Sequence, residues 1–276
     1  MVELQTSAEP IALGVNVHTT TAGDAKRRVS VLGVQITDVT RRAAIELMER
    51  PLRAVEHQCQ ALYIVNAHTL NLAADDPQYR DLLNQADIVF NDGTGVRWAA
   101  RQRGIELRNN LNGTDLIPEF LAATGGRGYR YFMLGATPDT IRDAAVVARR
   151  QFSGWTLAGY HDGYVHEERG DAVIEQINAA RVDLLLVGMG NPIQERWIHR
   201  HRTRLNVSLA VGIGGLFDHW IDKPKRAPLW VRRAGCEWMH KLLKQPHKWR
   251  RYLLGNPIFL YRMTAALKQD LAQMSR

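Results

Sequence analysis

Short apolar runs of strand length alternate along this chain with longer segments of helical periodicity, and this alternation restricts its fold more than any other feature. The apolar runs span residues 29–36, 61–65, 86–90, 129–135, 182–189 and 207–213. The helix-like segments span residues 41–49, 69–84, 93–103, 115–123, 138–152, 169–180 and 193–204. Strands that alternate with helices of this length are typical of α/β proteins. We therefore expect a Rossmann-like, mainly parallel sheet with flanking helices.

The distribution of charge divides the 276-residue chain into three parts. Residues 1–29 are polar without sustained periodicity, which predicts a loosely ordered N-terminal lead-in. We expect residues 30–222 to form the α/β core. Residues 223–276 contain 13 Lys and Arg but only 2 Asp and Glu, whereas residues 1–222 have a net charge of −3. A net charge of +11 on the last fifth of the chain indicates an anionic partner, which is a nucleic acid, a phospholipid surface or a phosphorylated substrate.

The basic C-terminal appendage, residues 223–276, also contains an amphipathic pattern. On a helical projection of residues 230–244, Trp230 and Trp238 lie on the apolar arc, and Arg233 and Lys244 lie on the other. Basic amphipathic helices of this kind are typical of membrane surfaces. No run approaches the roughly 20 apolar residues that span a bilayer, and two cysteines are too few for a disulfide framework. We expect a cytoplasmic protein, peripheral on the inner face of the cell membrane.

Polar or glycine-rich turns follow four of the apolar runs. They are Asn66-Ala67-His68, Asn91-Asp92-Gly93-Thr94-Gly95, Gly188-Met189-Gly190-Asn191-Pro192 and Gly212-Ile213-Gly214-Gly215. In open parallel sheets ligands bind at the carboxyl ends of the strands, so these turns should line one cleft. Several turns precede a helix N-terminus, which suits a diphosphate group.

Asp92 is the strongest single candidate for catalysis. It follows the apolar residues 88–90 and precedes Gly93 and Gly95, where a backbone can approach a ligand closely. A carboxylate there can accept a proton from a hydroxyl group as a general base. The alternative is a helix N-cap, which position alone favours.

Other polar residues at the turns have a functional and a structural interpretation each. Gln194 could bind a base or a sugar, and Glu195 could do the same or only favour the helix dipole. The segment 112–115 could touch a sugar, although capping a helix is the better interpretation. Asp218 could accept a hydrogen bond from a ribose hydroxyl, or be an exposed loop acid.

The sequence predicts neither a metal site nor a dinucleotide cofactor. The ten histidines show no metal-ligand spacing, and no Asp-x-Asp pair occurs. Ile193 and Phe217 stand where the third glycine of a dinucleotide fingerprint would be. Arg226 and Arg233 could neutralise a diphosphate in place of a metal, or merely coat a basic face.

Taken in order, these motifs and three others form a recognisable set. The others are Asn112-Gly113-Thr114-Asp115-Leu116, Asp162-Gly163-Tyr164 and Lys225-Arg226-Ala227-Pro228. From about Val31 to about Arg251 the set resembles the WecG/TagA/CpsF family of glycosyltransferases, family 26. The resemblance implies an inverting, metal-independent transfer of a hexose from a UDP-sugar to an undecaprenyl-diphosphate-linked saccharide, in cell-surface or exopolysaccharide synthesis.

The resemblance also implies roles for individual residues. Asp92 would be the general base, and the basic appendage would dock on an anionic membrane surface. The implied substrate-binding residues are Asn66, Thr94, Gly113, Thr114, Asp115, Gly163, Gly190, Gln194, Glu195, Asp218, Arg226 and Arg233. The chain departs from the family pattern at Ile64, at Asn110 and at Ala67-His68, so the donor hexose is N-acetylmannosamine, glucose or a similar sugar.

Two other classes of function remain open at this point. A nucleic-acid-binding protein would use the basic appendage, in which Arg and Trp alternate in a way compatible with base stacking. Another Rossmann-like enzyme that uses a nucleotide would share the glycine-rich strand ends. The resemblance predicts no nucleic-acid partner, and the sequence leaves a homo-oligomer open.

Overall fold

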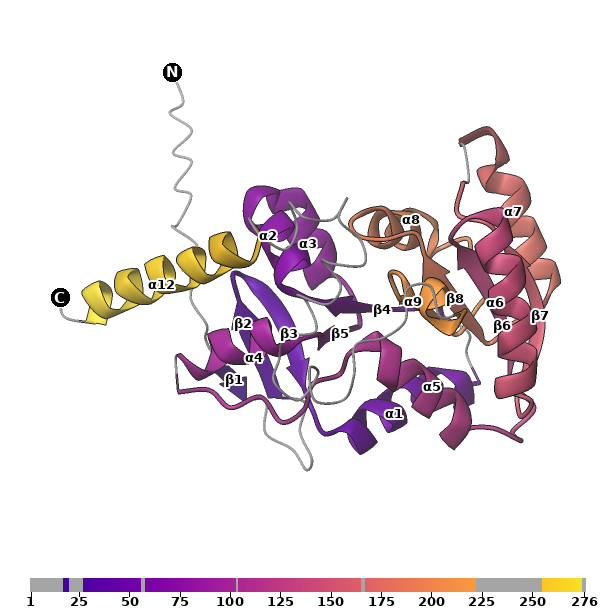
Figure 1. The fold of residues 1–276 in the computed structure, drawn as a ribbon, viewed down its shortest axis with the longest axis horizontal. Helices are drawn as coiled ribbons and strands as arrows, with labels where there is room; N and C mark the ends of the chain where they lie inside the picture. The colour runs from indigo at the N-terminus through magenta and orange to yellow at the C-terminus, as the bar shows by residue number, and fades with distance from the viewer. Residues whose placement is uncertain are drawn as a thin grey trace, which may run out of the picture.

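The computed structural model describes residues 17–19, 27–55, 58–102, 104–164, 167–221 and 255–274. Its centre is a parallel six-stranded sheet in the order β5-β4-β9-β8-β6-β7 (Figure 1). The strands are β4 (Gln60–Val65), β5 (Ile88–Asn91), β6 (Arg130–Gly135), β7 (Thr156–His161), β8 (Leu184–Gly188) and β9 (Leu209–Gly212). The expected Rossmann-like parallel sheet is confirmed.

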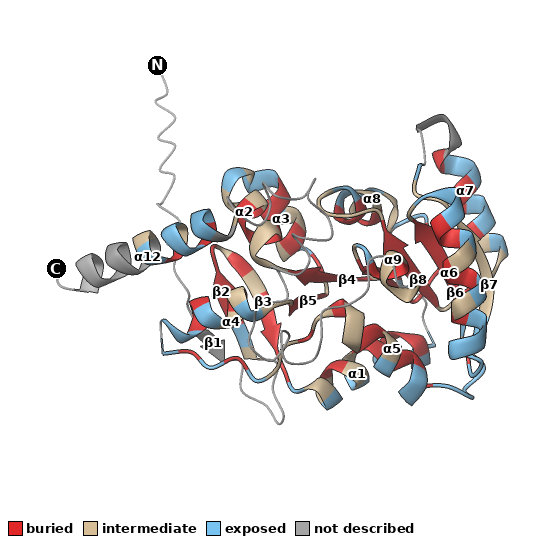
Figure 2. Ribbon diagram, viewed as in Figure 1, coloured by how far each residue is buried: buried red, intermediate tan, exposed pale blue. Residues whose placement is uncertain are grey.

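Helices cover both faces of this sheet, and the strand side chains alternate between two cores. Tyr63 and Val65 of β4 face one core, and Leu62 and Ile64 face the other. The first core is covered by α2 (Ala67–Asp75), α3 (Pro77–Asn84), α4 (Thr94–Arg101), α7 (Glu167–Ala179) and α8 (Ile193–His201). The second is covered by α1 (Arg41–Glu49), α5 (Gly113–Ala123), α6 (Pro138–Gln151) and α9 (Leu216–Trp220). Burial on both faces explains why the strands are continuous apolar runs (Figure 2).

The expected strand 29–36 is wrong, because this segment is a hairpin. A second, antiparallel sheet has the order β1 (Val17–Thr19), β2 (Arg27–Val31) and β3 (Val34–Asp38). Leu32 and Gly33 form the turn with φ angles of 49° and 80°. Positive φ at both central residues is the geometry that matches the twist of a two-residue hairpin. Thus one strand, β1, and the first part of a second, β2, lie within the expected N-terminal lead-in.

The expected helix 69–84 is two helices, α2 and α3, and the break occurs at a proline. Asp76 has φ −124° and ψ 98°, outside the helical region, and its side chain caps α3 by accepting from Tyr79 N. Pro77 disfavours helical geometry in the residue before it and is well suited to the first turn of the next helix. A short 3₁₀ helix, η1 (Arg50–Arg53), follows α1. The sequence patterns predicted neither β7 nor α9, and β7 is an edge strand in which Thr156 is exposed and the other residues are partly buried.

The last helix, α12 (Gly255–Met274), contains residues of the predicted appendage and packs on the α/β core. Phe259 and Met263 are 1% and 2% exposed and belong to the first core. Asn71 of α2 donates to the carbonyl of Gly255 at 2.7 Å, and Arg262 pairs with Asp75 at 2.5 Å. The predicted amphipathic segment 230–244 lies outside the described residues. Among the helices that the structure describes, none is long and apolar enough to cross a bilayer.

Candidate active site

The register of the parallel strands brings the predicted turns to one edge of the sheet. Val65 at the end of β4 pairs with Asn91 at the end of β5. Gly212 of β9 pairs with Tyr63, and Gly188 of β8 pairs with Gly135 of β6. All six strands run in the same direction, so the turns after them share this carboxyl edge, as expected from the sequence.

Asp92 lies directly beside the end of β4. Its backbone N–H donates to the carbonyl of Val65 at 2.8 Å, and its side chain is half-buried. The N-cap of α4 is Gly93, with φ 98°, and Thr94 is the first helical residue. The N-cap position that the sequence suggested for Asp92 is therefore occupied by Gly93.

A loop before α5 supports the residues around Asp92. The side-chain oxygen of Asn110 accepts from Gly93 N at 2.8 Å. Asn91 is fully buried. Its side-chain NH₂ group donates to the backbone carbonyl of Asn109 at 3.0 Å, and its backbone carbonyl accepts from Leu111 N at 3.1 Å. Asn91 belongs to one of the predicted polar turns, but its sequence position alone did not assign it this anchoring role.

Two of the predicted binding segments cap helices. The Asn66 side chain accepts from the backbone N–H groups of His68 and Thr69 at 3.0 and 3.2 Å, in a capping box at the start of α2. The Asn112 side chain accepts from Asp115 N and from the Thr114 hydroxyl, both at 2.9 Å. Capping was the favoured interpretation of segment 112–115, and this geometry agrees with it.

Gly113 and Gly163 allow close packing behind these turns. A β-carbon at Gly113 would lie 3.1 Å from Cδ1 of Ile64, and one at Gly163 would lie 3.1 Å from Cα of Gly135. Gly163 also donates its N–H to the carbonyl of Ala136 at 2.9 Å, which joins the turns after β6 and β7. These glycines bring the strand-end turns together whether or not they touch a ligand.

Gln194 and Glu195 lie below the turns rather than on their surface. They are 1% and 0% exposed. The side-chain oxygen of Gln194, Oε1, accepts from Gly190 N at 3.3 Å and from Gly214 N at 2.9 Å. Burial, partly offset by hydrogen bonds from its neighbours, raises the pKa of Glu195 to about 7. Both side chains therefore have hydrogen-bond partners inside the protein, and Glu195 does more than favour the helix dipole.

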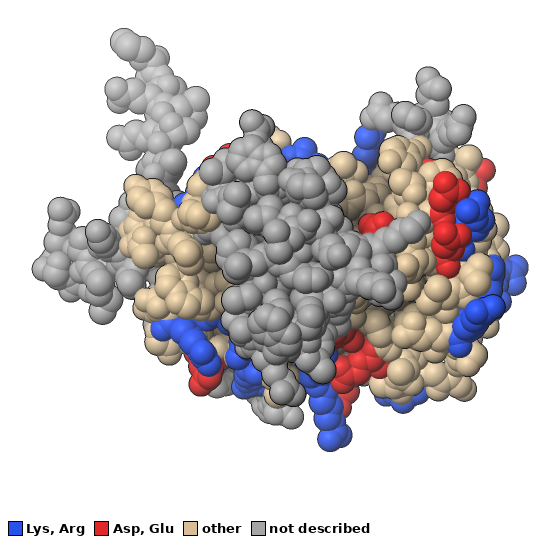
Figure 3. Space-filling view, in the orientation of Figure 1, with Lys and Arg blue, Asp and Glu red and all other residues tan. Residues whose placement is uncertain are grey.

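Asp218 lies in α9 at the same edge of the sheet, half-buried, one turn after Gly214. Arg226 and Arg233 lie outside the described residues. Within the parts of the chain that the structure describes, no group of three or more His, Cys, Asp or Glu side chains could hold a metal ion. Acidic and basic side chains both occur on the described surface in Figure 3.

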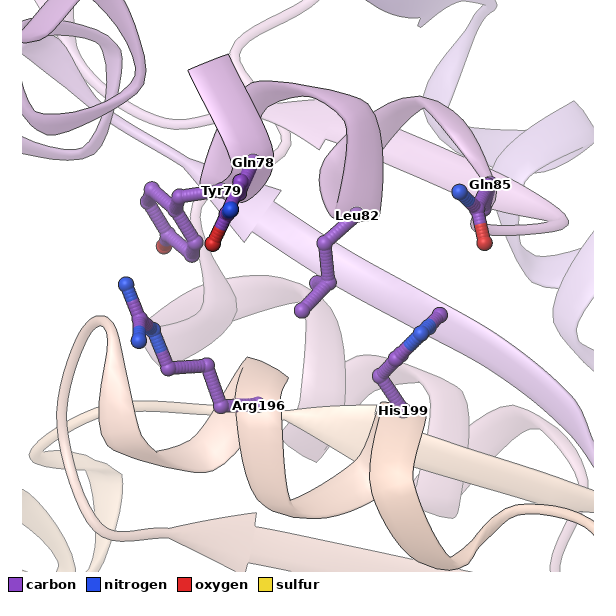
Figure 4. A pocket seen from close by; sticks show the side chains of 6 residues that line it. All are labelled: Gln78, Tyr79, Leu82, Gln85, Arg196 and His199. Atoms are coloured by element: carbon purple, nitrogen blue, oxygen red, sulfur yellow. The ribbon is translucent and has the colours of Figure 1, made fainter. Parts of the chain in front are cut away.

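A separate groove of about 230 Å³ lies between α3 and α8 (Figure 4). It is lined by Gln78, Tyr79, Leu82, Gln85, Arg196 and His199. None of these residues belongs to the strand-end turns, and the Arg196 guanidinium is engaged with Asp76 at 2.6 Å. We therefore place the candidate active site at the turns and not in this groove.

The fold and this edge are those of Rossmann-like proteins, which bind ligands at the carboxyl ends of their parallel strands. Residues 29–274 match the family described as "Glycosyl transferase WecG/TagA/CpsF family". This match spans most of the chain, which therefore belongs to that family and is an enzyme of the glycosyltransferase class.

Three proteins similar to this chain share one transferase name. The chain is 36% identical over 200 residues to an N-acetylglucosaminyldiphosphoundecaprenol N-acetyl-beta-D-mannosaminyltransferase of Bacillus spizizenii, covering 72% of this chain and 76% of that protein. Proteins of the same name are 32% identical in Bacillus subtilis, over 68% of this chain and 73% of theirs, and 29% identical in Staphylococcus aureus, over 88% and 94%. These names do not favour the nucleic-acid-binding protein or another nucleotide-using enzyme.

Proposed function

We propose that this enzyme transfers a hexose from a UDP-sugar to a polyprenyl-diphosphate-linked saccharide, with inversion at the anomeric carbon. The relatives' names support N-acetylmannosamine as the sugar and N-acetylglucosaminyl-diphosphoundecaprenol as the acceptor. The observation that most supports the site is the position of Asp92, half-buried where the ends of β4 and β5 meet.

In this mechanism Asp92 is the general base. The acceptor hydroxyl oxygen attacks the anomeric carbon, the bond from that carbon to the diphosphate breaks, and Asp92 takes the hydroxyl proton. UDP leaves with the bonding electrons, so the reaction balances without a redox partner. A positioned base of this kind typically contributes ~10²–10⁴-fold in rate.

The departing diphosphate requires positive charge or hydrogen-bond donors. The capped helix starts of α2 and α5 face the carboxyl edge, and helix N-termini favour anions. Thr94 at the start of α4, Gly190 in the turn after β8 and Asp218 in α9 lie at the same edge and are proposed contacts to the nucleotide or sugar. Arg226 and Arg233 are proposed to add charge from the appendage, which makes the transfer independent of a metal ion.

The experiment combines a donor screen with an Asp92 variant. The wild-type protein is incubated with a panel of UDP-sugars and a short-chain diphosphate-linked N-acetylglucosamine, with EDTA present. We expect UDP release with UDP-N-acetylmannosamine, and a decrease in turnover of ~10²-fold or more in Asp92→Asn with UDP binding retained.

Asp87→Asn provides the matched control, because Asp87 lies at the opposite end of β5. Its carboxylate accepts from Ala61 N at 2.8 Å and pairs with Arg202 at 2.9 Å, so its role is structural. This variant should lower stability and leave turnover per folded molecule near the wild-type value. Near-normal turnover in Asp92→Asn would remove the assignment of the base, and activity lost on chelation and restored by Mg²⁺ would remove metal independence.

A further inference from the structure

Glu195 is a buried carboxylate whose oxygens are both satisfied by neighbouring side chains. One oxygen accepts from the amides of Asn191 and Gln194, at 2.6 and 2.7 Å. The other accepts from the hydroxyl of Tyr79 on α3, at 3.1 Å. The residue is 0% exposed, so it has no direct path to a substrate.

Gln194 links Glu195 to two turns of the candidate active site. Its side-chain oxygen, Oε1, accepts from Gly190 N in the turn after β8 and from Gly214 N in the turn after β9. A flipped amide would present its NH₂ group to these two N–H donors, and no hydrogen bond would form. Glu195 accepts from the NH₂ group at 2.7 Å and therefore selects the orientation that joins both turns.

The network is fixed from outside the turns as well. Tyr79 holds the second carboxylate oxygen from α3, and the hydroxyl of Tyr63 on β4 donates to the backbone carbonyl of Glu195 at 3.2 Å. Glu195 is thus connected to α3, β4 and the start of α8. Buried networks whose members all have partners fix a unique geometry, and one missing acceptor leaves several donors unpaired.

We propose that Glu195 is a positioning residue, which acts through Gln194 to hold the turns after β8 and β9 together at the donor-binding edge. The assignment rests on the proposed function only in the choice of ligand, a uridine nucleotide. It replaces direct substrate contact by Glu195 with an indirect role.

Two substitutions separate this role from simple packing. In Glu195→Gln, the amide oxygen can still accept from Asn191 and Gln194, and its NH₂ group can donate to the Tyr79 oxygen. In Glu195→Met the volume is similar, but the three donors lose their acceptor. The glutamine variant should therefore preserve the turns, and the methionine variant should release them.

The experiment uses the full chain and two measurements. Hydrogen exchange at Gly190 and Gly214 reports directly on the bonds to Gln194, and titration with UDP reports on the site. For Glu195→Met we expect exchange at both glycines to become at least tenfold faster and the dissociation constant for UDP to rise about tenfold, the size expected when buried donors lose a partner. Glu195→Gln should stay within about threefold of wild type in both measurements.

Glu49→Met is the matched control. Glu49 is another buried glutamate, 4% exposed, held by Arg53, Arg127 and Tyr129. Tyr129 directly precedes β6, so this cluster lies at the opposite edge of the sheet. The control should lose stability without faster exchange at Gly190 and Gly214 and without a change in UDP affinity.

Each outcome decides a separate point. Unchanged exchange at both glycines in Glu195→Met overturns the positioning role, whatever the ligand. Faster exchange with unaltered UDP affinity would show that the turns are joined but do not position the nucleotide, which also overturns it. A wild-type protein that binds no UDP contradicts the proposed function instead, and the exchange measurement still tests the link from Glu195 to the turns.

Discussion

At the level of single residues, Glu195 combines complete burial with a titratable group. Burial raises its pKa from 4.5 to about 7 because desolvation disfavours the charged form, and hydrogen bonds from Gln194, Tyr79 and Asn191 oppose this shift. In the unfolded chain the same carboxyl ionises near 4.5. Between these values the folded protein binds a proton that the unfolded chain does not.

This difference makes stability depend on pH in a defined direction. The contribution of Glu195 is largest below about pH 4.5 and decreases as pH rises to about 7, by about 3 kcal/mol in total. Glu195→Gln cannot ionise and should lack this contribution. Urea denaturation of the wild-type and Glu195→Gln proteins from pH 4.5 to 8 measures this contribution. If the free energies of unfolding of the two proteins change with pH in parallel, the raised pKa of Glu195 is contradicted.

Other residues show that the same residue type has different roles at different turns. Asn66 and Asn112 use their side chains to cap helices. Asn91 instead anchors the loop before α5. Asp92 stands next to a glycine cap. Because a capping side chain is already engaged, a test that distinguishes cap from ligand contact must measure stability together with substrate affinity.

At the level of elements, α12 connects the end of the chain to the candidate active site. Phe259 lies close to Gly95 in α4, where an added β-carbon would be 3.9 Å from its ring and 3.6 Å from Ala67 of α2. Both α2 and α4 begin at the carboxyl edge of the sheet. The docked helix therefore packs beside the first turn of α4 and against Asn71 and Asp75 of α2, and Figure 1 shows α12 next to α2.

Removing the Phe259 ring should weaken this contact measurably. Phe259→Ala is expected to lower the free energy of unfolding by about 3 kcal/mol, because a fully buried ring is replaced by a cavity. Tyr261→Ala on the same helix is the control, since Tyr261 is 73% exposed and its loss should cost less than about 0.5 kcal/mol. Equal urea midpoints for the two variants would show that α12 contributes little to the fold.

At the level of the whole molecule, the positive charge is concentrated in residues 223–276, a segment that also contains the packed helix α12. The described core has mixed charges (Figure 3), whereas residues 223–276 have a net charge of +11. A cut before residue 223 would remove the basic segment together with the buried contacts of α12. Membrane binding is therefore better tested by removing charge than by truncation.

The triple variant Lys241→Gln, Lys244→Gln and Lys248→Gln keeps α12 and removes three positive charges. Each basic residue near an anionic leaflet contributes on the order of 1 kcal/mol, so binding to vesicles with phosphatidylserine or phosphatidylglycerol should weaken by roughly 10²-fold. Co-sedimentation at low and high salt measures this effect. Binding at low salt should decrease, and binding at high salt should be weak for both proteins.

A control removes the same number of charges from the core. Arg149, Arg150 and Arg181 are exposed, and their replacement by glutamine changes the net charge equally. If both triple variants bind vesicles alike, the appendage is not the membrane-docking surface.

The fold class and the gathering of the strand-end turns at one edge of the sheet were predictable from sequence because both depend on local pattern. Parallel strands buried on two faces must be apolar throughout, and polar turns must follow them. The hairpin at Leu32-Gly33 was not predicted because two apolar strands with a two-residue turn resemble one longer run. The edge strand β7 was not predicted because it is only partly buried.

The sequence by itself determined the alternation of strands and helices, the motifs of the family and the unequal distribution of charge. Only the tertiary structure decided which polar residues are buried and with whom they bond. Tyr79 and Glu195 are 116 residues apart, and no local pattern indicates that they meet. Hydrogen-bond partners and pKa shifts depend on distances between segments, and packing of the sheet and helices sets those distances.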